Sequence, residues 1–398
     1  MPDILLNKRL FASLLKFLFG AFLLLKVYRG FYGGVGSQGG IWNFIQLFFV
    51  VTGFTLCFSH LKAFFSNKAI FLFLFVFFYM WFASFFPFIV NGNYTIPSIF
   101  FFLLKPYGFF VFMCFLYCGI QLNLKDSKYP MMILFIILSA LVVYSMLKYR
   151  VLFIFDEKGA VADVYYLLGL LPYMFVVSKK LKIFFFLLTF FAIMLTGKRA
   201  GFLCIAIIFV LNFLSTIQYE PKIKKYLFFI TIVSVFVFAQ EFIVSYFNLD
   251  IFSRLEKLNS DGGSGRSFRW NLIWNAFYYE SNPFQFLFGH GSGSCISLVG
   301  HAHNDFIEIL YDYGLVLFLL YVAFYIFLIK DAIVMKIKGY PYVREFTSTI
   351  VVMLFLAMFS FFAIDCMYII STSFCLGIFY ADWYKFQNGL TDDSIKFK

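Results

Sequence analysis

Charged side chains are scarce in this sequence: only 13% of its 398 residues are Asp, Glu, Lys or Arg, whereas 63% are hydrophobic. A soluble protein of this length needs a far more charged surface, so the composition excludes an ordinary soluble globular protein. Sixty-five phenylalanines and a mean hydropathy of +0.89 instead indicate an integral membrane protein.

Other local signals are also missing. No small-x-small cleavage site follows the first apolar run, so we expect that run to be retained as a span. The seven cysteines form no Cys-x-x-Cys pair, and most lie inside apolar runs, where Cys usually acts as a small hydrophobe. The net charge is +12, but the sequence has neither a basic stripe nor base-stacking aromatics at a groove. We therefore expect no nucleic-acid partner.

Long apolar runs fill most of the chain. A helix needs about 20 apolar residues to cross a bilayer, and by that measure we predict an all-α polytopic membrane protein with about twelve transmembrane helices. The predicted spans are 10–27, 41–60, 69–90, 97–120, 130–147, 160–178, 182–196, 200–217, 225–246, 306–329, 346–364 and 367–384. The segment TGKRAG separates the seventh from the eighth, because two adjacent cations are costly near a bilayer centre.

The lysines predict the orientation of these spans. If the N-terminus lies in the cytoplasm, every inside segment is basic, as the positive-inside rule requires, and both termini are cytoplasmic. We expect three regions: transmembrane helices 1–9 in residues 1–246, a large outer loop in 247–305, and helices 10–12 with a cytoplasmic tail in 306–398.

Arginine does not follow the lysine pattern. Six of the eight arginines fall on the outer side: Arg29, Arg150, Arg199, Arg254, Arg266 and Arg269. A guanidinium presents a fixed fork of donors that matches phosphate oxygens in pairs, which an ammonium cannot do. We therefore expect a phosphate-bearing ligand at the outer face, bound by Arg199 and Arg266 with support from Arg269. Ordinary loop salt bridges are the alternative, and they are favoured for Arg29 and Arg150.

The outer loop is the longest connection and contains its own pattern. RSFRWNLIWNAFYY (266–279) is typical of an amphipathic helix at the membrane interface, with Trp and Tyr at headgroup level. SDGGSG (260–265) before it is expected to form a flexible hinge. Together they predict a lid over a site at the membrane surface.

Three of the four histidines, His290, His301 and His303, lie in one short polar stretch. HAHNDFIEILYDYG runs from this stretch into the tenth span, where Asp305 and Glu308 have the spacing of a capping box. His303 then precedes a helix N-terminus, whose positive end keeps an imidazole neutral and attracts anions. His303 is therefore a candidate general base beside a phosphate. For His290 and His301, hydrogen-bonded loop histidines are the favoured interpretation.

Two further patterns in this stretch have simple interpretations. GHGSGS (289–294) predicts tight turns, and its freed backbone amides are at most a weak hint of phosphate or sugar contact. A zinc site made of His290, Cys295, His301 and His303 has irregular spacing and no second ligand cluster. We expect no metal and no other cofactor.

HAHNDFIEILYDYG resembles the histidine motif of the bacterial O-antigen polymerase and ligase superfamily: His, then Asn, Ser or Gln, nine residues, Gly, two residues, Gly. His303, Asn304 and Gly314 match, and Leu317 stands in place of the last glycine. TGKRAG (196–201) resembles the family's short outer loop with an arginine, although Lys198 departs from the usual Ser. SGRSFRW and NPFQFLFGHGSG resemble the elements that precede the histidine in the long outer loop.

The resemblance implies a GT-C-type fold with a long periplasmic loop, in the bacterial inner membrane, with an active site facing the periplasm. The donor would be a glycan on undecaprenyl pyrophosphate, transferred to a sugar hydroxyl with inversion and without a metal. The implied catalytic residues are His303, Arg199 and Arg266, and the implied substrate-binding residues are Arg269, Asn304, His301 and His290.

Four functions remain open, the least favoured of the enzymes being a protein O-glycosyltransferase. A composition skewed toward Phe, Ile, Lys, Tyr and Asn resembles that of an AT-rich O-antigen cluster and favours a polymerase, which extends the next lipid-linked repeat unit. A ligase would transfer the glycan to lipid A–core. A transporter or flippase would predict buried mid-membrane charges in related halves, and Lys105, Asp163 and Glu241 are not placed symmetrically. Expected partners are the undecaprenyl-pyrophosphate-linked oligosaccharide, membrane lipid, a chain-length regulator and a flippase.

Overall fold

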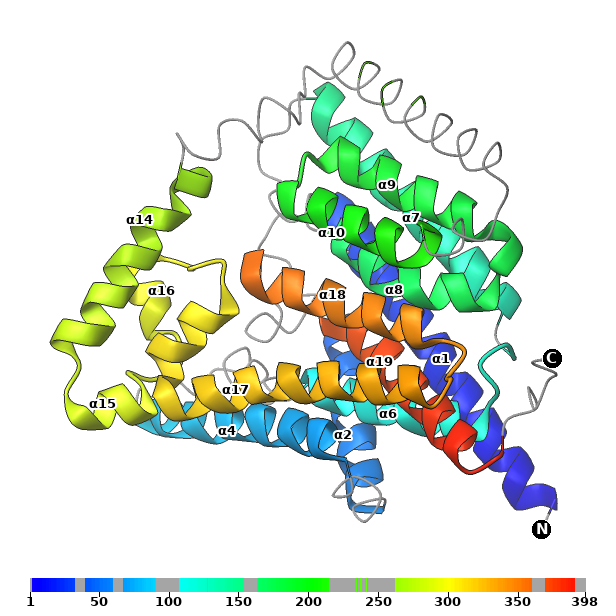
Figure 1. Ribbon diagram of the computed structural model, residues 1–398, viewed down its shortest axis with the longest axis horizontal. Helices are drawn as coiled ribbons and strands as arrows, with labels where there is room; N and C mark the ends of the chain where they lie inside the picture. Colours follow the sequence, from blue (N-terminus) through cyan, green and yellow to red (C-terminus); the bar gives the residue numbers. More distant parts are fainter. Residues whose placement is uncertain are drawn as a thin grey trace.

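The chain folds into a bundle of apolar helices with a group of short helices at one end (Figure 1). This computed structural model describes residues 2–32, 40–59, 67–90, 107–126, 128–152, 163–214, 262–359 and 369–390, and the isolated positions 234, 237 and 241. Within these ranges the regular structure is entirely helical and contains no strand.

The bundle is built from long helices of the two halves of the chain. Its N-terminal helices are α1 (Pro2–Tyr32), α2 (Gly40–Ser59), α4 (Lys68–Val90), α6 (Tyr107–Gln121), α7 (Lys128–Leu152), α8 (Val164–Val177), α9 (Lys182–Thr196) and α10 (Arg199–Phe209). A 3-10 turn, η2 (Lys179–Leu181), leads into α9, and a π-helical turn, η3 (Val210–Leu214), continues α10. Its C-terminal helices are α17 (Asp305–Ile337), α18 (Val343–Phe359) and α19 (Ile369–Gln387).

Three helices form the centre of the bundle. Every residue of α8 and most residues of α6 and α19 are buried, as is typical of helices that neighbours surround on most sides. On α19, a Cβ added at Gly377 would come within 2.6 Å of the Phe112 carbonyl oxygen on α6. The absence of a side chain there lets the two backbones approach closely, which is how helices often pack in membranes.

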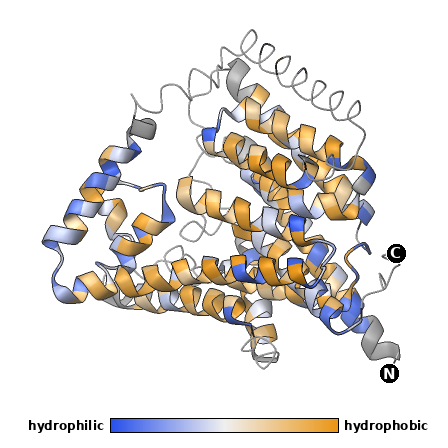
Figure 2. Ribbon diagram, viewed as in Figure 1, coloured by the Kyte–Doolittle hydropathy of each residue, from blue (hydrophilic) through white to orange (hydrophobic). Residues whose placement is uncertain are grey.

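The outside of the bundle is apolar as well (Figure 2). Large apolar side chains such as Phe17, Phe44 and Phe82 are each more than 65% exposed. Among the described residues, four helices are long and apolar enough to cross a membrane: Asn7–Val27, Lys68–Phe85, Lys128–Leu147 and Asp305–Ile337. These are the features of an α-helical membrane protein, so the predicted class is confirmed.

The predicted spans agree with the helices wherever the two can be compared. Each predicted span that falls within the described ranges coincides with a helix, and the break at TGKRAG is confirmed, because α9 ends at Thr196 and α10 begins at Arg199. Gly197 closes α9 in a left-handed conformation, with a φ of +63°. The ninth predicted span, 225–246, lies almost wholly outside the described residues, so the count of twelve stays a prediction.

The short helices lie where α17 begins (Figure 1). They are α14 (Gly262–Asn275), the π-helical turn η4 (Ala276–Glu280), α15 (Pro283–Phe288) and α16 (Ser294–Val299). We call residues 262–300 the α14–α16 segment. The helix predicted for 266–279 is confirmed as part of α14 and η4, and its amphipathic position at the membrane interface stays a prediction. The segment predicted as a hinge, 260–265, overlaps α14, because α14 already begins at Gly262. Gly265 has a left-handed φ of +76° within this helix.

Candidate functional site

The α14–α16 segment has a hydrophobic core of its own, separate from the core of the bundle. The buried members are Ile273, Ala276, Phe277, Cys295, Ala302, Leu310 and Tyr311. Two of these, Leu310 and Tyr311, belong to the first turns of α17. The segment is therefore packed onto the start of a long helix, which gives its polar residues fixed positions.

Two glycines allow this packing. Gly314 interrupts α17 with a φ of +79°, and a Cβ there would collide with the Leu287 carbonyl oxygen and the Gly289 amide nitrogen. A Cβ at Gly289, whose φ is +85°, would collide with the Asp312 carbonyl group in turn. Backbone therefore lies directly on backbone at this crossing. Gly314, the glycine of the histidine motif, thus allows close contact with the preceding loop.

The glycine-rich turn after Gly289 is held by Asp312. The two carboxylate oxygens of Asp312 accept hydrogen bonds of 2.7 Å from the amides of Gly293 and Cys295. The His290 ring stacks on Tyr311 with its centroid 4.2 Å away, and its two nitrogens contact Ser281 Oγ and the Tyr311 carbonyl oxygen. These contacts fix the turn, so His290 has a structural role here and its role in substrate binding stays a prediction.

The turn that carries His303 is held from several sides. Trp270 Nε1 donates to the Ala302 carbonyl oxygen at 2.8 Å, and Arg269 Nη1 donates to the His301 carbonyl oxygen at 3.0 Å. From below, the buried Glu308 carboxylate accepts the Ala302 amide hydrogen at 3.1 Å, and its other oxygen lies 3.3 Å from His301 Nδ1.

The capping box predicted for Asp305 and Glu308 is wrong. The N-cap of α17 is Asn304, whose side-chain oxygen accepts hydrogen bonds from the amides of Phe306 and Ile307. Glu308 lies one position beyond the place that a box with this N-cap requires, and it reaches back to the turn at Ala302 instead. Asp305 is buried and accepts a hydrogen bond from Tyr321.

His303 has an unusual backbone and an unusual proton affinity. Its φ of +53° makes it the one non-glycine residue with a positive φ in the part of the chain that the structure describes. Such conformations cost about 1–3 kcal/mol and cluster at functional sites. Burial, followed by the neighbouring charges of Arg266, His301, Arg269 and Lys198, lowers its pKa to about 4. The imidazole is therefore neutral at pH 7.

Cations from two parts of the chain gather beside this ring. Lys198 and Arg199 come from the turn between α9 and α10, and Arg266 and Arg269 come from the first half of α14. Burial, together with Arg199 and Arg269 and against an opposing effect of Tyr165, lowers the pKa of Arg266. Four like charges within mutual influence are unfavourable alone and favour a bound anion.

The guanidinium groups of α14 are oriented but only partly used. Arg266 Nη1 donates to the Phe359 carbonyl oxygen at 3.0 Å, and Arg269 Nη1 to His301 as given above. Each guanidinium carries five N–H donors, so both retain donors beyond those that the described residues accept. The structure thus brings together the predicted Arg199, Arg266, Arg269, His301 and His303.

Three contributors escaped the sequence prediction. Lys198 appeared only as a departure from a motif, yet its ammonium lies 6.0 Å from the Tyr165 ring centroid and adds to the cationic field at His303. Glu308 and Trp270 hold the 301–303 turn, and their spacing in sequence contains no sign of that contact. Lys198 could have been predicted from its position next to Arg199, because two adjacent cations outside a span lie in the same surroundings.

The remaining candidates are the other arginines predicted on the outer side and the alternative zinc ligands. Arg254 and the side chains of Arg29 and Arg150 lie outside the described residues. Among the residues that are described, no group of three or more His, Cys, Asp or Glu side chains has the arrangement of a metal site. In the alternative zinc set, the His290 ring contacts the Tyr311 carbonyl oxygen, and the backbone amide of Cys295 donates to the Asp312 carboxylate.

A helical membrane bundle with a neutral histidine and clustered cations at one end defines an integral membrane protein with a cationic site. Residues 184–322 match the family model described as O-antigen ligase, and this match supports a relation of these residues to the O-antigen ligase and polymerase superfamily. This match contains all seven predicted site residues. It indicates a membrane glycosyltransferase-like enzyme of lipopolysaccharide biosynthesis. No curated protein matches the chain.

Proposed function

We propose that the protein is an O-antigen polymerase. It transfers the growing glycan from undecaprenyl pyrophosphate to a sugar hydroxyl of the next lipid-linked repeat unit, at the periplasmic face of the inner membrane. The reaction inverts the anomeric centre and uses no metal. The observation that carries this proposal is the grouping of Lys198, Arg266 and Arg269 beside a neutral His303, with Arg199 beside Arg266.

The cations act on the leaving group. As the bond from the anomeric carbon to the pyrophosphate breaks, negative charge develops on the phosphate oxygens, and positioned cations stabilise it. The unused donors of Arg266 and Arg269 match such oxygens in pairs. One positioned donor typically contributes a factor of about 10²–10³ to the rate constant.

His303 acts on the nucleophile. A sugar hydroxyl attacks once a base takes its proton, and the neutral ring accepts that proton. Before a donor binds, a pKa of about 4 makes the ring a weak base. A bound diphosphate offsets the charges that lower this pKa, so donor binding strengthens the base only when a leaving group is in place.

The α14–α16 segment supplies contact with the membrane surface. Phe268 and Trp274 on α14 are 66% and 54% exposed, whereas Ile273 is packed into the segment's core. Exposed aromatic side chains on this helix suit a lid at headgroup level, beneath which a polyprenyl chain lies in the bilayer.

An O-antigen ligase is the second candidate, because the matched family model carries that description. In cells that also hold a working ligase and flippase, His303→Ala separates the two. Loss of a polymerase leaves lipid A–core capped with single repeat units, since ligation continues. Loss of a ligase leaves bare core and long chains held on undecaprenyl pyrophosphate. Unchanged long-chain lipopolysaccharide would contradict both functions and agree with a transporter.

A further inference from the structure

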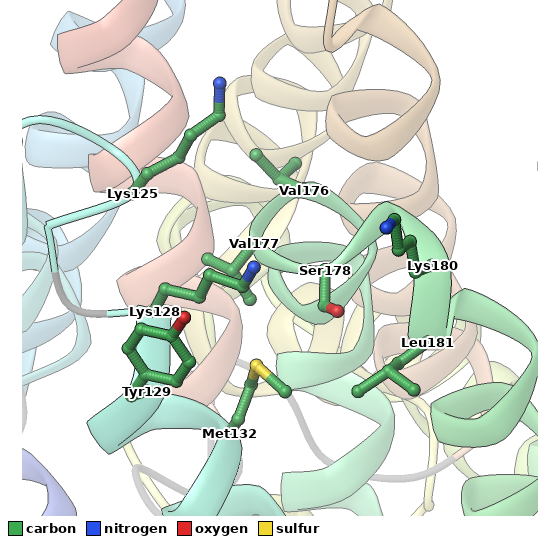
Figure 3. A pocket seen from close by; sticks show the side chains of 9 residues that line it. All are labelled: Lys125, Lys128, Tyr129, Met132, Val176, Val177, Ser178, Lys180 and Leu181. Atoms are coloured by element: carbon green, nitrogen blue, oxygen red, sulfur yellow. The ribbon is translucent and has the colours of Figure 1, made fainter.

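A cavity of about 530 Å³ lies between α7 and α8, with the turn after α6 and η2 at its edges (Figure 3). It is at the other end of α8 from the candidate site. Tyr165, near the start of α8, lies beside Lys198, whereas Ser178 just after the helix lines the cavity. At 1.5 Å per residue, α8 separates the two by about 20 Å.

The lining of the cavity combines cations with apolar side chains. Three lysines, Lys125, Lys128 and Lys180, line it together with Ser178. The other lining residues are Tyr129, Met132, Val176, Val177 and Leu181. Figure 3 shows the lysines coming from three different segments around one space. The lining contains no carboxylate, so its charge complements an anion.

The nearby carboxylates have other partners. Asp126 accepts the amide hydrogen of Asn123. Glu345 pairs at 2.8 Å with Lys182, which follows the lining residue Leu181 in sequence but does not line the cavity. Within the described part of the chain, neither Lys128 nor Lys180 forms an ion pair with a carboxylate. Lys128 instead lies 5.5 Å from the Tyr129 ring centroid. Two lysines of this cavity thus have no ion-pair partner among the described residues.

The apolar surface beside the cavity decides the kind of anion. Tyr129 and Ile133 on α7 are 71% and 58% exposed, and Ile183 and Phe184 on α9 are 45% and 46% exposed. Tyr129 itself lines the cavity, and Ile183 and Phe184 follow the lining residue Leu181 by two and three positions. A free inorganic anion gains nothing from them, whereas acyl chains pack against them while lysines hold the phosphate above.

We propose that this cavity binds the headgroup of an anionic glycerophospholipid, in the leaflet opposite the His303 site. Lys128 and Lys180 hold the phosphate, with Lys125 and Ser178 beside them. The lipid wedges the start of α7 against the end of α8. Since α8 leads to Tyr165 and Lys198, lipid at one end stabilises the helix that supports the site at the other.

The test uses the purified full-length chain, stripped of lipid in neutral detergent. Thermal unfolding is followed as phosphatidylglycerol is titrated, with phosphatidylethanolamine and inorganic phosphate as separate arms. Phosphatidylglycerol should raise the midpoint with saturation. The double variant Lys128→Gln/Lys180→Gln should weaken apparent affinity about thirty-fold, since each lysine near a charged membrane contributes about fivefold. If the double variant does not fold, Lys180→Gln alone should weaken it about fivefold.

The matched control is Lys330→Gln/Lys336→Gln, which removes the same charge from the exposed last turns of α17. It should bind phosphatidylglycerol as the wild type does. An equal loss of phosphatidylglycerol affinity in both double variants would show diffuse charge attraction and overturn the proposal. Unchanged affinity in both double variants would overturn it as well. Protection by inorganic phosphate alone, or equal protection by phosphatidylethanolamine, would also overturn it.

Discussion

The buried carboxylate of Glu308 and the backbone amide of Ala302 are joined by a hydrogen bond of 3.1 Å beneath the turn that carries His303. The same carboxylate lies 3.3 Å from His301 Nδ1, while Arg269 and Trp270 hold the carbonyl groups of this turn from the other side. His303 keeps its left-handed backbone because its neighbours are fixed. Glu308 is therefore a positioning residue.

Replacing Glu308 tests that role. Glu308→Ala leaves a buried amide without its acceptor, at a cost of about 1–3 kcal/mol, and frees the turn. We expect kcat to fall by at least tenfold with little change in KM. Glu308→Gln retains an oxygen for the Ala302 amide and should recover most of kcat. Equal loss in the two variants, measured with lipid-linked repeat units, would assign the effect to the carboxylate charge instead.

The pKa of His303 predicts the acid side of the pH profile. A base acts only when deprotonated, and the pKa of this ring is lowered from 6.5 to about 4 in the free protein. The ratio kcat/KM should therefore stay level down to about pH 5 and fall as the pH drops through about 4. His303→Ala should lower kcat by about 10²–10⁴ and abolish this limb. A limb near pH 6.5 in the wild type would contradict the described environment of the ring.

Arg266 should affect both the rate and the position of that limb. Apart from burial, the charge of Arg266 is the largest cause that lowers the pKa of His303. Arg266→Gln should therefore move the acid limb of the residual activity to higher pH. The rate should fall by about 10² or more. Arg266→Lys retains the charge and should leave the limb in place while losing paired phosphate contact. If the acid limb of Arg266→Gln lies at the same pH as in the wild type, Arg266 does not influence the pKa of His303.

The crossing of Gly289 and Gly314 makes a prediction about stability. Gly314→Ala places a Cβ against the Leu287 carbonyl oxygen at a φ of +79°, so we expect a loss of about 3 kcal/mol or more. Gly339→Ala is the control, because its φ is +72° and no atom lies within 4 Å of the added Cβ. It should cost about 1 kcal/mol. Similar midpoints of thermal unfolding for the two variants would show that the crossing is not tightly packed.

Much of this arrangement was predictable from local patterns. Apolar length located the helices, and the pair Lys198 and Arg199 marked the break between α9 and α10. The unusual placement of arginine identified Arg199, Arg266 and Arg269 as a group, because the bilayer sorts charge and leaves few reasons for cations on the wrong side. The motif around His303 then indicated which histidine to place beside them.

The supports of the site were not predictable in this way. Asn304 and Asp305 are both good N-caps, and only the backbone at residue 304 decides between them, which in turn changes what Glu308 contacts. His290 and Tyr311 stack across 21 positions because two glycines let a loop cross α17. Such contacts depend on tertiary packing, which no spacing along the chain encodes.

Purified protein, lipid-linked repeat units and a chelator test the central claim most directly. With no lipid A–core present, a metal-independent polymerase should extend the repeat units into long chains on undecaprenyl pyrophosphate, and Arg266→Gln and His303→Ala should each slow the growth of that ladder by about 10² or more. Chain growth at the wild-type rate in both variants, or growth that appears only once a core acceptor is added, would contradict the account.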